Sequence, residues 1–225
     1  MILAAQAYEQ YRTPCTYEWM LRVGDPRTPP ILFVPPLFEE LNRTRALIVA
    51  VMRRLAAEGH GCWLPDLSAT GESLIDLESV TWSDWRHDVS AAAAHVEAAS
   101  GKKPVVASMR GGALIDDSVE AHCWWRFAPA RGQALARDLD RASLAGGAEW
   151  AGYPAAAELR RDLAAAEPAG VPKVRVVRLS TDAGEADGKI EGPALWRRSE
   201  PGTSEELAAA LAADLNAWSR ACAAS

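Results

Sequence analysis

Short apolar runs alternate along the chain with longer segments in which apolar residues recur every three or four positions. Each run is bounded by glycine, proline or polar residues, which is typical of strands buried on both faces of a sheet. The clearest runs are residues 31–36, 61–67, 104–109 and 122–128. Helical spacing occupies the segments between the first three of them. This alternation implies right-handed crossovers, so the pattern predicts an α/β fold with a mostly parallel central sheet and helices on both faces.

The two long helices of this pattern have recognisable ends. Asn42 is the expected N-cap of the first helix, whose apolar positions recur until Gly59. The second is expected from about Trp82 to Ala99, with Thr81 or Ser83 as its cap.

Weaker patterns predict the remaining elements of the sheet. An exposed strand is expected at residues 17–22 and a short helix at residues 111–121. A further strand is expected at residues 171–180, a last strand around residues 194–197, and a closing helix at residues 204–221. The closing helix begins after Thr203 or Ser204, either of which can cap it, and it has glutamates in its first turn.

Residues 131–169 differ in character, because they are rich in alanine and arginine and have the pattern of two amphipathic helices. The segment is too short to hold a core of its own. It is therefore expected to be a helical cap inserted into a single domain that spans residues 1–225.

Charge and apolar content exclude several classes of function. A formal net charge of -6 and a pI near 5.3 make a nucleic-acid-binding surface unfavourable. No apolar run approaches the roughly 20 residues that span a bilayer, and the N-terminus lacks the pattern of a signal peptide. A cytoplasmic protein without a membrane span is expected, and no sequence signal points to an oligomeric state.

The cysteines give no sign of a metal or redox site. Cys15, Cys62, Cys123 and Cys222 form no C-x-x-C motif and have no nearby histidine pair. We expect reduced and mostly buried thiols, with no metal ion and no cofactor.

The segment VVASMRGGALI, residues 105–115, carries the most informative motif. A strand that runs into a glycine pair resembles the nucleophile elbow of α/β hydrolases, where small residues two positions before and after the serine relieve crowding. Here Ser108 and Gly112 are the small residues, which places Arg110 at the nucleophile position. An alignment that uses Gly111 places Met109 there instead. Neither alignment supplies a serine, cysteine or aspartate.

The catalytic histidine of such a hydrolase is also missing. It is expected in a loop after the last strand, downstream of the nucleophile and the acid. Of the four histidines only His122 follows the elbow, and it begins a strand. The expected loop contains Glu200 and no histidine, whereas Asp182 stands near the usual position of the acid. The Ser-His-Asp triad therefore lacks two of its members.

Arg110 needs a compensating negative charge, because a guanidinium at a helix N-terminus opposes the helix dipole. Five carboxylates are expected on the same rim of the sheet, at Glu39, Glu40, Asp66, Asp182 and Glu200. Two hypotheses stay open: an internal salt bridge that replaces the triad, or a site for an anionic ligand. The residues expected to contact that ligand are Glu39, Asn42, Arg43, Met109, Gly111, Trp125 and Trp196.

Several stretches, spread in order over most of the chain, resemble the type 2 hydrolase associated with the exosortase A system. They are PPLFEELNRTR, LPDLSATGES, TWSDWRHDV, SMRGGALI, WWRFAPARGQ, WAGY and GPALWRRSEP. The resemblance implies an α/β-hydrolase fold with arginine at the elbow, encoded near genes for exopolysaccharide export. A fold does not by itself establish a function.

Two functions follow from these residues. The first is an esterase or acyl hydrolase for a small or lipid-linked ester in exopolysaccharide or surface-protein export, in which Glu40 or Glu200 activates water and Arg110 stabilises the oxyanion. The second is a catalytically inactive pseudo-hydrolase that binds an anionic small-molecule or lipid-linked ligand, or a protein partner. A displaced nucleophile, Ser73 or Cys123, is a third alternative.

Overall fold

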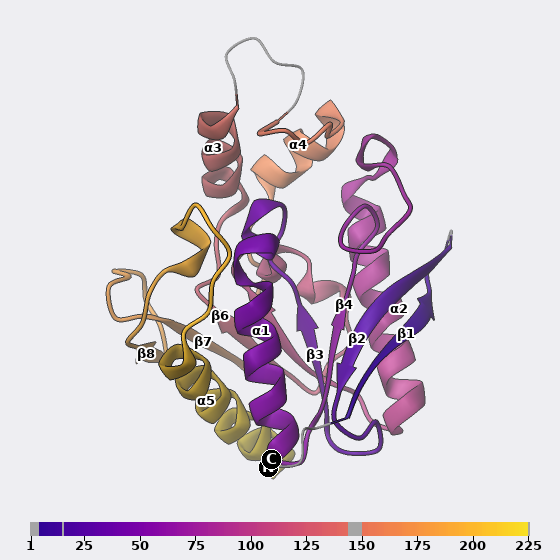
Figure 1. The fold of residues 1–225 in the computed structure, drawn as a ribbon, viewed down its shortest axis with the longest axis vertical. Coiled ribbons are helices and arrows are strands. Elements are labelled where there is room, and N and C mark those ends of the chain that lie inside the picture. The colour runs from indigo at the N-terminus through magenta and orange to yellow at the C-terminus, as the bar shows by residue number, and fades with distance from the viewer. Residues whose placement is uncertain (1–4, 15, 144–149, 225) are drawn as a thin grey trace.

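The computed structural model describes residues 5–14, 16–143 and 150–224. This part of the chain contains an eight-stranded sheet in the order β1-β2-β4-β3-β5-β6-β7-β8 (Figure 1). The strands are β1 (Gln6–Arg12), β2 (Tyr17–Val23), β3 (Pro30–Val34), β4 (Gly61–Pro65), β5 (Val105–Met109), β6 (Cys123–Phe127), β7 (Val174–Leu179) and β8 (Gly188–Ile190). Strands β4 to β8 in this order pair in parallel, and the β1–β2 hairpin adds antiparallel to β4. The mostly parallel sheet expected from the alternating pattern is confirmed.

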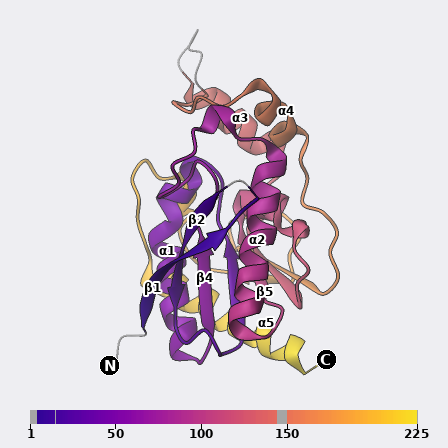
Figure 2. The same ribbon diagram turned by 90° about the vertical axis from the view of Figure 1, so that its right-hand side faces the viewer.

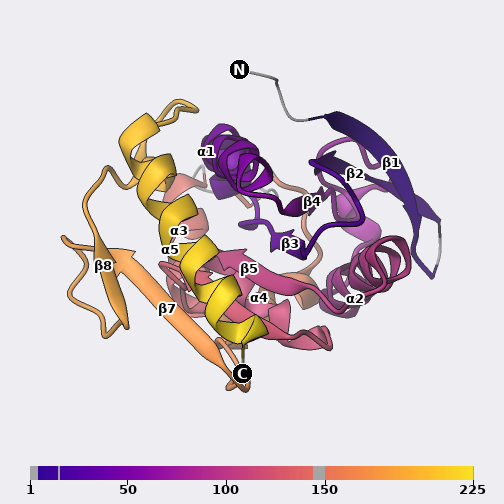
Figure 3. The ribbon, with the colours of Figure 1, turned by 90° about the horizontal axis from the view of Figure 1, so that it is seen from below.

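Helices cover both faces of the sheet. They are α1 (Glu39–Ala57), α2 (Trp82–Ser100), α3 (Gly132–Ala142), α4 (Ala157–Ala165) and α5 (Glu205–Ala223). Figure 2 shows α1 and α2 on opposite sides of the sheet, and Figure 3 shows α5 from below. None of the described helices is long and apolar enough to cross a membrane.

Alternate residues of the central strands supply two apolar cores, because successive side chains of a strand point to opposite faces. Ile31 and Phe33 of β3 pack with α1 and α5, whereas Leu32 and Val34 pack with α2 and the α3–α4 pair. Every residue of β3, β4, β5 and β6 is buried, as expected for strands covered on both faces.

The helix ends agree with the expected caps in two cases and differ in one. Thr81 caps α2 through a reciprocal capping box with Asp84, and the side chain of Ser204 accepts a hydrogen bond from the Leu207 N–H of α5. The first helix begins at Glu39 instead of after Asn42, because Phe38 has a left-handed φ of 54° and turns the chain directly into α1.

Two predicted elements are wrong. Residues 194–197 form a short 3-10 turn, Leu195–Arg197, and the last strand is β8. The helix predicted at residues 111–121 is replaced by two 3-10 turns, Arg110–Leu114 and Asp116–Ser118. The glycine pair disfavours a helix there, and Asp116 is drawn into the core by its ion pair with Arg126.

Helices α3 and α4 form the expected cap over the carboxyl ends of the parallel strands (Figure 1). They pack so closely at Gly132 that a Cβ there would lie 1.8 Å from the carbonyl oxygen of Leu163. The indole of Trp150 donates a hydrogen bond of 2.6 Å to Asp140, which ties the segment after α3 back to that helix. The cap therefore closes one end of the sheet.

Candidate functional site

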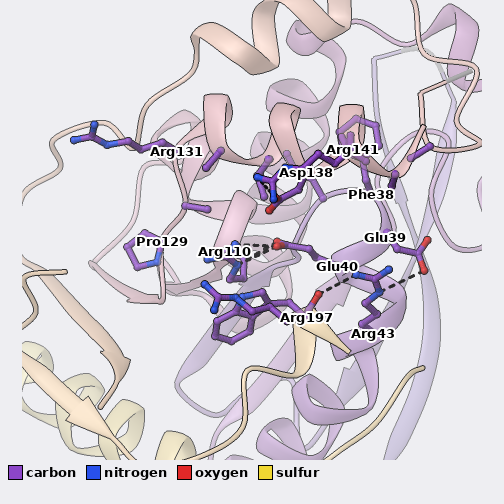
Figure 4. Close-up of a pocket in the computed structure, with 18 of the residues that line it drawn as sticks. Phe38, Glu39, Glu40, Arg43, Arg110, Pro129, Arg131, Asp138, Arg141 and Arg197 are labelled. Carbon is purple, nitrogen blue, oxygen red and sulfur yellow. Dashed lines mark hydrogen bonds and ion pairs between the residues drawn. The ribbon is translucent and has the colours of Figure 1, made fainter. Parts of the chain in front are cut away.

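A cavity of about 800 Å³ lies between the cap and the carboxyl ends of the strands. Its walls come from the loop before α1 and the first turn of α1, from Arg110 after β5, from the loop after β6 together with α3, and from the 3-10 turn near the C-terminus (Figure 4). Ligands of open α/β sheets bind at this edge, beyond the carboxyl ends of the strands. The cavity is thus the candidate site.

Arg110 stands on a sharp turn directly after β5. Its φ is 54°, a left-handed conformation that is unfavourable for a residue with a Cβ. The glycine two residues later is required sterically, because a Cβ at Gly112 would lie 2.5 Å from the carbonyl oxygen of Val34 and 2.6 Å from that of Pro35. This strained strand-to-turn geometry is the one that the sequence predicted for an elbow with Arg110 at its tip.

Glu40, in the first turn of α1, is the carboxylate that compensates Arg110. The Nη2 of Arg110 donates to Oε1 of Glu40 at 2.9 Å, and its Nε donates to the same carboxylate at 3.1 and 3.3 Å. Nη1 donates to the carbonyl oxygen of Ala128 at 3.2 Å, and the guanidinium lies 4.7 Å from the centre of the Trp196 ring. The side chains of Arg110 and Glu40 are only 13% and 12% exposed. The guanidinium is therefore held in one position and largely shielded from water.

The other four candidate carboxylates have different environments. Asp66 is buried and pairs with Arg45 at 2.7 Å, and Asp182 pairs with Arg178 at 2.8 Å. Glu39 lies 3.7 Å from Arg43 and accepts a hydrogen bond from the Tyr153 hydroxyl, which links the cap to α1. Glu200 is exposed and is not among the residues that line the cavity.

Burial raises the pKa of Glu40 above its ordinary value, although the Arg110 guanidinium acts in the opposite direction. The desolvation of the carboxyl group thus outweighs the attraction of the cations Arg110 and Arg43. An acid with a raised pKa beside a fixed cation is a common feature of functional sites.

The structure brings together five of the predicted site residues in the cavity wall: Glu39, Glu40, Arg43, Arg110 and Trp196. The predicted ligand contacts outside the wall are Asn42, which is exposed, and Met109 and Gly111, which are buried beside Arg110.

Trp125 was expected to contact the ligand, but it does not line the cavity. Its side chain lies in the core, its ring stacks on Phe127, and its indole N–H donates to Asp214 of α5 at 2.7 Å. Trp125 was expected to follow or end its strand at the ligand edge, but it lies in the middle of β6 and faces the α1–α5 side of the sheet.

The predicted site residues did not include five charged residues of the cavity wall. They are Arg131, Asp138, Arg141, Arg178 and Arg197. The arginine-rich composition of the cap segment was a signal for Arg131 and Arg141, because α3 presents one face to the cavity. Arg178 follows from its place near the carboxyl end of β7, which is the edge where ligand contacts are expected.

The displaced nucleophiles do not lie in the cavity. Ser73 donates a hydrogen bond of 2.8 Å to Glu18, and Cys123 is buried in the core, where burial raises the pKa of its thiol. Cys62, Cys123 and Cys222 are buried and form no disulfide, as expected, whereas Cys15 lies outside the described residues. In the part of the chain that the structure describes, no serine, threonine, cysteine, lysine or histidine lines the cavity. The same residues include no cluster of three metal-ligating side chains.

Comparisons with known proteins identify the fold. No family model matches the sequence, and no curated protein matches it. A hyperthermophilic esterase from the archaeon Pyrobaculum calidifontis matches 100% of this chain and 85% of its own length at 11% identity, with a TM-score of 0.58. An α/β serine hydrolase without a lid from Xanthomonas campestris matches 98% of this chain and 96% of its own length at 14% identity, with a TM-score of 0.56.

An epoxide hydrolase from Vigna radiata is a more distant match, with 13% identity and a TM-score of 0.44 over 55% of this chain. This chain spans 40% of the length of that protein. The esterase and the serine hydrolase, which match nearly the whole chain, show that it has the α/β-hydrolase fold.

Proposed function

We propose that this α/β-hydrolase-fold protein binds an anionic ligand at Arg110 and has no serine-hydrolase activity. The observation that supports the proposal is the elbow itself, whose tip carries a guanidinium that faces the cavity. The lining residues that the structure describes include no hydroxyl, thiol or imidazole group that could form or deprotonate an acyl-enzyme nucleophile. The site is therefore better suited to binding than to covalent catalysis.

The charges of the cavity wall favour an anion. Six arginines and three carboxylates line it in the described part of the chain. Arg131 and Arg141 pair with Glu167 and Asp138, but the side chains of both arginines are more than 70% exposed. Exposed ion pairs contribute about 0–1 kcal/mol each to stability. These arginines can therefore leave their carboxylate partners and contact a ligand with little loss of stability. Arginine also suits carboxylate and phosphate oxygens, which it binds in bidentate fashion.

The proposal is tested by thermal unfolding in the presence of inorganic phosphate. We expect phosphate to raise the melting temperature of the wild-type protein, and to leave the double variant Arg110→Met/Glu40→Gln unchanged. Both partners are replaced together because a lone buried Glu40 would destabilise the fold. Arg161→Met is the matched control, since Arg161 is exposed on α4 and lies outside the cavity wall. An equal shift in the double variant would contradict the proposal.

A second candidate function is hydrolysis of an acyl ester by water that Glu40 activates. The observation that favours it is the raised pKa of Glu40, because a base is most effective when its pKa lies near the working pH. Arg110 would then stabilise the oxyanion. Turnover of p-nitrophenyl acyl esters that disappears in Glu40→Gln would support this function. The absence of turnover for every acyl chain length from acetate to decanoate would contradict this function.

The cellular context is proposed from the resemblance to the exosortase A-associated type 2 hydrolase. We propose a cytoplasmic protein whose ligand is an anionic small molecule or a lipid-linked precursor in exopolysaccharide or surface-protein export. Deletion of the gene in its source organism should reduce the exported material, and the double variant Arg110→Met/Glu40→Gln should fail to restore it. If export is unchanged after deletion, the proposed role in exopolysaccharide or surface-protein export is contradicted.

A further inference from the structure

The cavity has two walls of different chemistry. One is mainly apolar and is made by Leu37 and Phe38 before α1 together with Ala134, Leu135 and Leu139 of α3, with Asp138 and Arg141 of the same helix also lining the cavity. The other, which contains Arg110, Trp196 and Arg197, is cationic and aromatic (Figure 4). A ligand that fills the space must therefore present different surfaces to the two walls.

The apolar wall continues along α3. Leu135, Leu139 and Ala142 lie four and three residues apart, which places them on one face of the helix, and all three line the cavity. With a rise of 1.5 Å per residue this stripe is about 10 Å long. Leu135 and Leu139 also belong to the core on the α2 side of the sheet, so what the stripe offers a ligand is the part of these side chains, together with Ala142, that lines the cavity.

The cationic wall keeps hydrogen-bond donors for a ligand. Glu40 and the Ala128 carbonyl take one N–H from each nitrogen of the Arg110 guanidinium. Since arginine has five N–H groups, Nη1 and Nη2 each retain one. Arg197 is exposed and has no ion-pair partner among the residues that the structure describes.

Trp196 adds an independent sign that an acceptor is missing. Its side chain lies under the Arg110 guanidinium, and the residue is 6% exposed. Its indole N–H is buried and has no hydrogen-bond partner in the described part of the chain. A buried donor without a partner is uncommon in folded proteins and calls for an acceptor such as a ligand oxygen.

We infer that the ligand is an anionic amphiphile, in which one oxyanion carries an unbranched hydrocarbon chain. The inference rests on the proposed function, since it assigns the ligand of the same cavity. The oxyanion binds at Arg110 and Arg197, and the chain lies against the α3 stripe. An alkyl carboxylate and an alkyl phosphate share this chemistry.

Isothermal titration below micelle-forming concentrations tests the inference with five probes: inorganic phosphate, butyl phosphate, octyl phosphate, octanoate and octanol. Each methylene that enters apolar contact is expected to tighten binding about fourfold. Octyl phosphate should therefore bind far more tightly than butyl phosphate, and octanol should bind much more weakly than either octyl anion. The comparison of octanoate with octyl phosphate shows which oxyanion the site prefers.

A pair of tryptophan substitutions on α3 locates the hydrocarbon chain. Ala134→Trp fills the apolar side of the cavity and should abolish the advantage of octyl over butyl phosphate. Gln133→Trp is the matched control, because Gln133 is exposed on the same helix and does not line the cavity. Equal loss in both variants would overturn the inference.

The outcomes for the two proposals can be distinguished. If butyl and octyl phosphate bind equally, or if octanol binds as tightly as octyl phosphate, the amphiphile is wrong. The anion-binding function survives the first of these results provided that phosphate binding still depends on Arg110. If no anion binds, both proposals fail.

Discussion

Arg110 combines the backbone of a hydrolase elbow with a side chain of opposite character. The left-handed turn after β5 persists, but in place of a nucleophile it holds a guanidinium that Glu40, Ala128 and Trp196 fix in position. A cation held in place before a ligand arrives loses little conformational entropy on binding. At the scale of the residue, this geometry supports the proposal that the elbow binds an anion.

A second buried ion pair is connected to the elbow through Ser108. Arg126 pairs with Asp116 at 2.7 Å, the two side chains are 6% and 0% exposed, and Asp116 also accepts from Ser108, two residues before Arg110. Arg126→Met leaves a buried carboxylate unpaired and should lower the free energy of unfolding by about 3–5 kcal/mol. Urea denaturation measures the loss, and the exposed Arg161→Met should change stability by less than 1 kcal/mol. Equal effects of the two substitutions would contradict this role.

Asp88 should make the stability of the protein depend on pH. Burial raises the pKa of this carboxyl, which accepts a hydrogen bond from the Ser68 N–H. Because the folded pKa is raised, the contribution of the group is fully present below the unfolded pKa of about 3.9 and is lost as pH rises through the folded pKa. Asp88→Asn keeps the acceptor without the charge. Its melting temperature at pH 7.5 should exceed that of the wild type, by about 2–4 °C for each kcal/mol gained.

The difference between Asp88→Asn and the wild type should shrink as the pH is lowered toward 4, because the wild-type carboxyl is then protonated as well. Thermal melts at several pH values provide the measurement. A constant difference at every pH would show that Asp88 does not titrate with a raised pKa.

At the scale of the element, the site depends on how β5 passes into its turn. Gly112→Ala should destabilise the protein by about 1–3 kcal/mol, because the new Cβ would meet the backbone oxygens of Val34 and Pro35. It should also displace Arg110 and weaken phosphate binding. Gly170→Ala is the control, since a Cβ there meets no atom within 4 Å and should change stability by less than about 0.5 kcal/mol. Normal phosphate binding by Gly112→Ala would contradict the requirement for this turn.

The sequence predicted the long elements well and the short ones poorly. Strands β3 to β6 and helices α2 and α5 stand out because burial on both faces and helical periodicity are local signals. Residues 111–121 and 194–197 form 3-10 turns, whose conformations depend on contacts such as the ion pair between Asp116 and Arg126. The edge strand β1 was not predicted at all, since its mostly polar residues depend on pairing with β2.

The same distinction applies to the site. Arg110 and Glu40 could be predicted because they follow buried strands or belong to the elbow motif. Trp196 was predicted from a strand at residues 194–197, which is a 3-10 turn, although the residue does line the cavity. Which of five carboxylates pairs with Arg110 is a question of tertiary distance, and the pattern left it open. The cavity arginines of α3 depend on the rotation of that helix over the sheet.

At the scale of the whole molecule, the fold is shared with hydrolases at 11–14% identity. The cavity lies at the carboxyl ends of the strands, the edge where open α/β sheets bind ligands. If the chemistry is as proposed, a fluorophosphonate probe should label no residue, because the cavity wall that the structure describes has no activated hydroxyl. Mass spectrometry of the intact protein provides the measurement, with a serine esterase as the positive control. Stoichiometric labelling of one serine would show that the protein has a displaced nucleophile, contrary to the proposed function.

The most direct test of the account is a crystal structure of the protein with bound octyl phosphate. We expect phosphate oxygens within hydrogen-bond distance of Nη1 or Nη2 of Arg110, and an alkyl chain in contact with Leu135 and Leu139 of α3. A phosphate group bound elsewhere, with Arg110 engaged only by Glu40, would show that the pair is a structural replacement for the triad and would contradict the central claim.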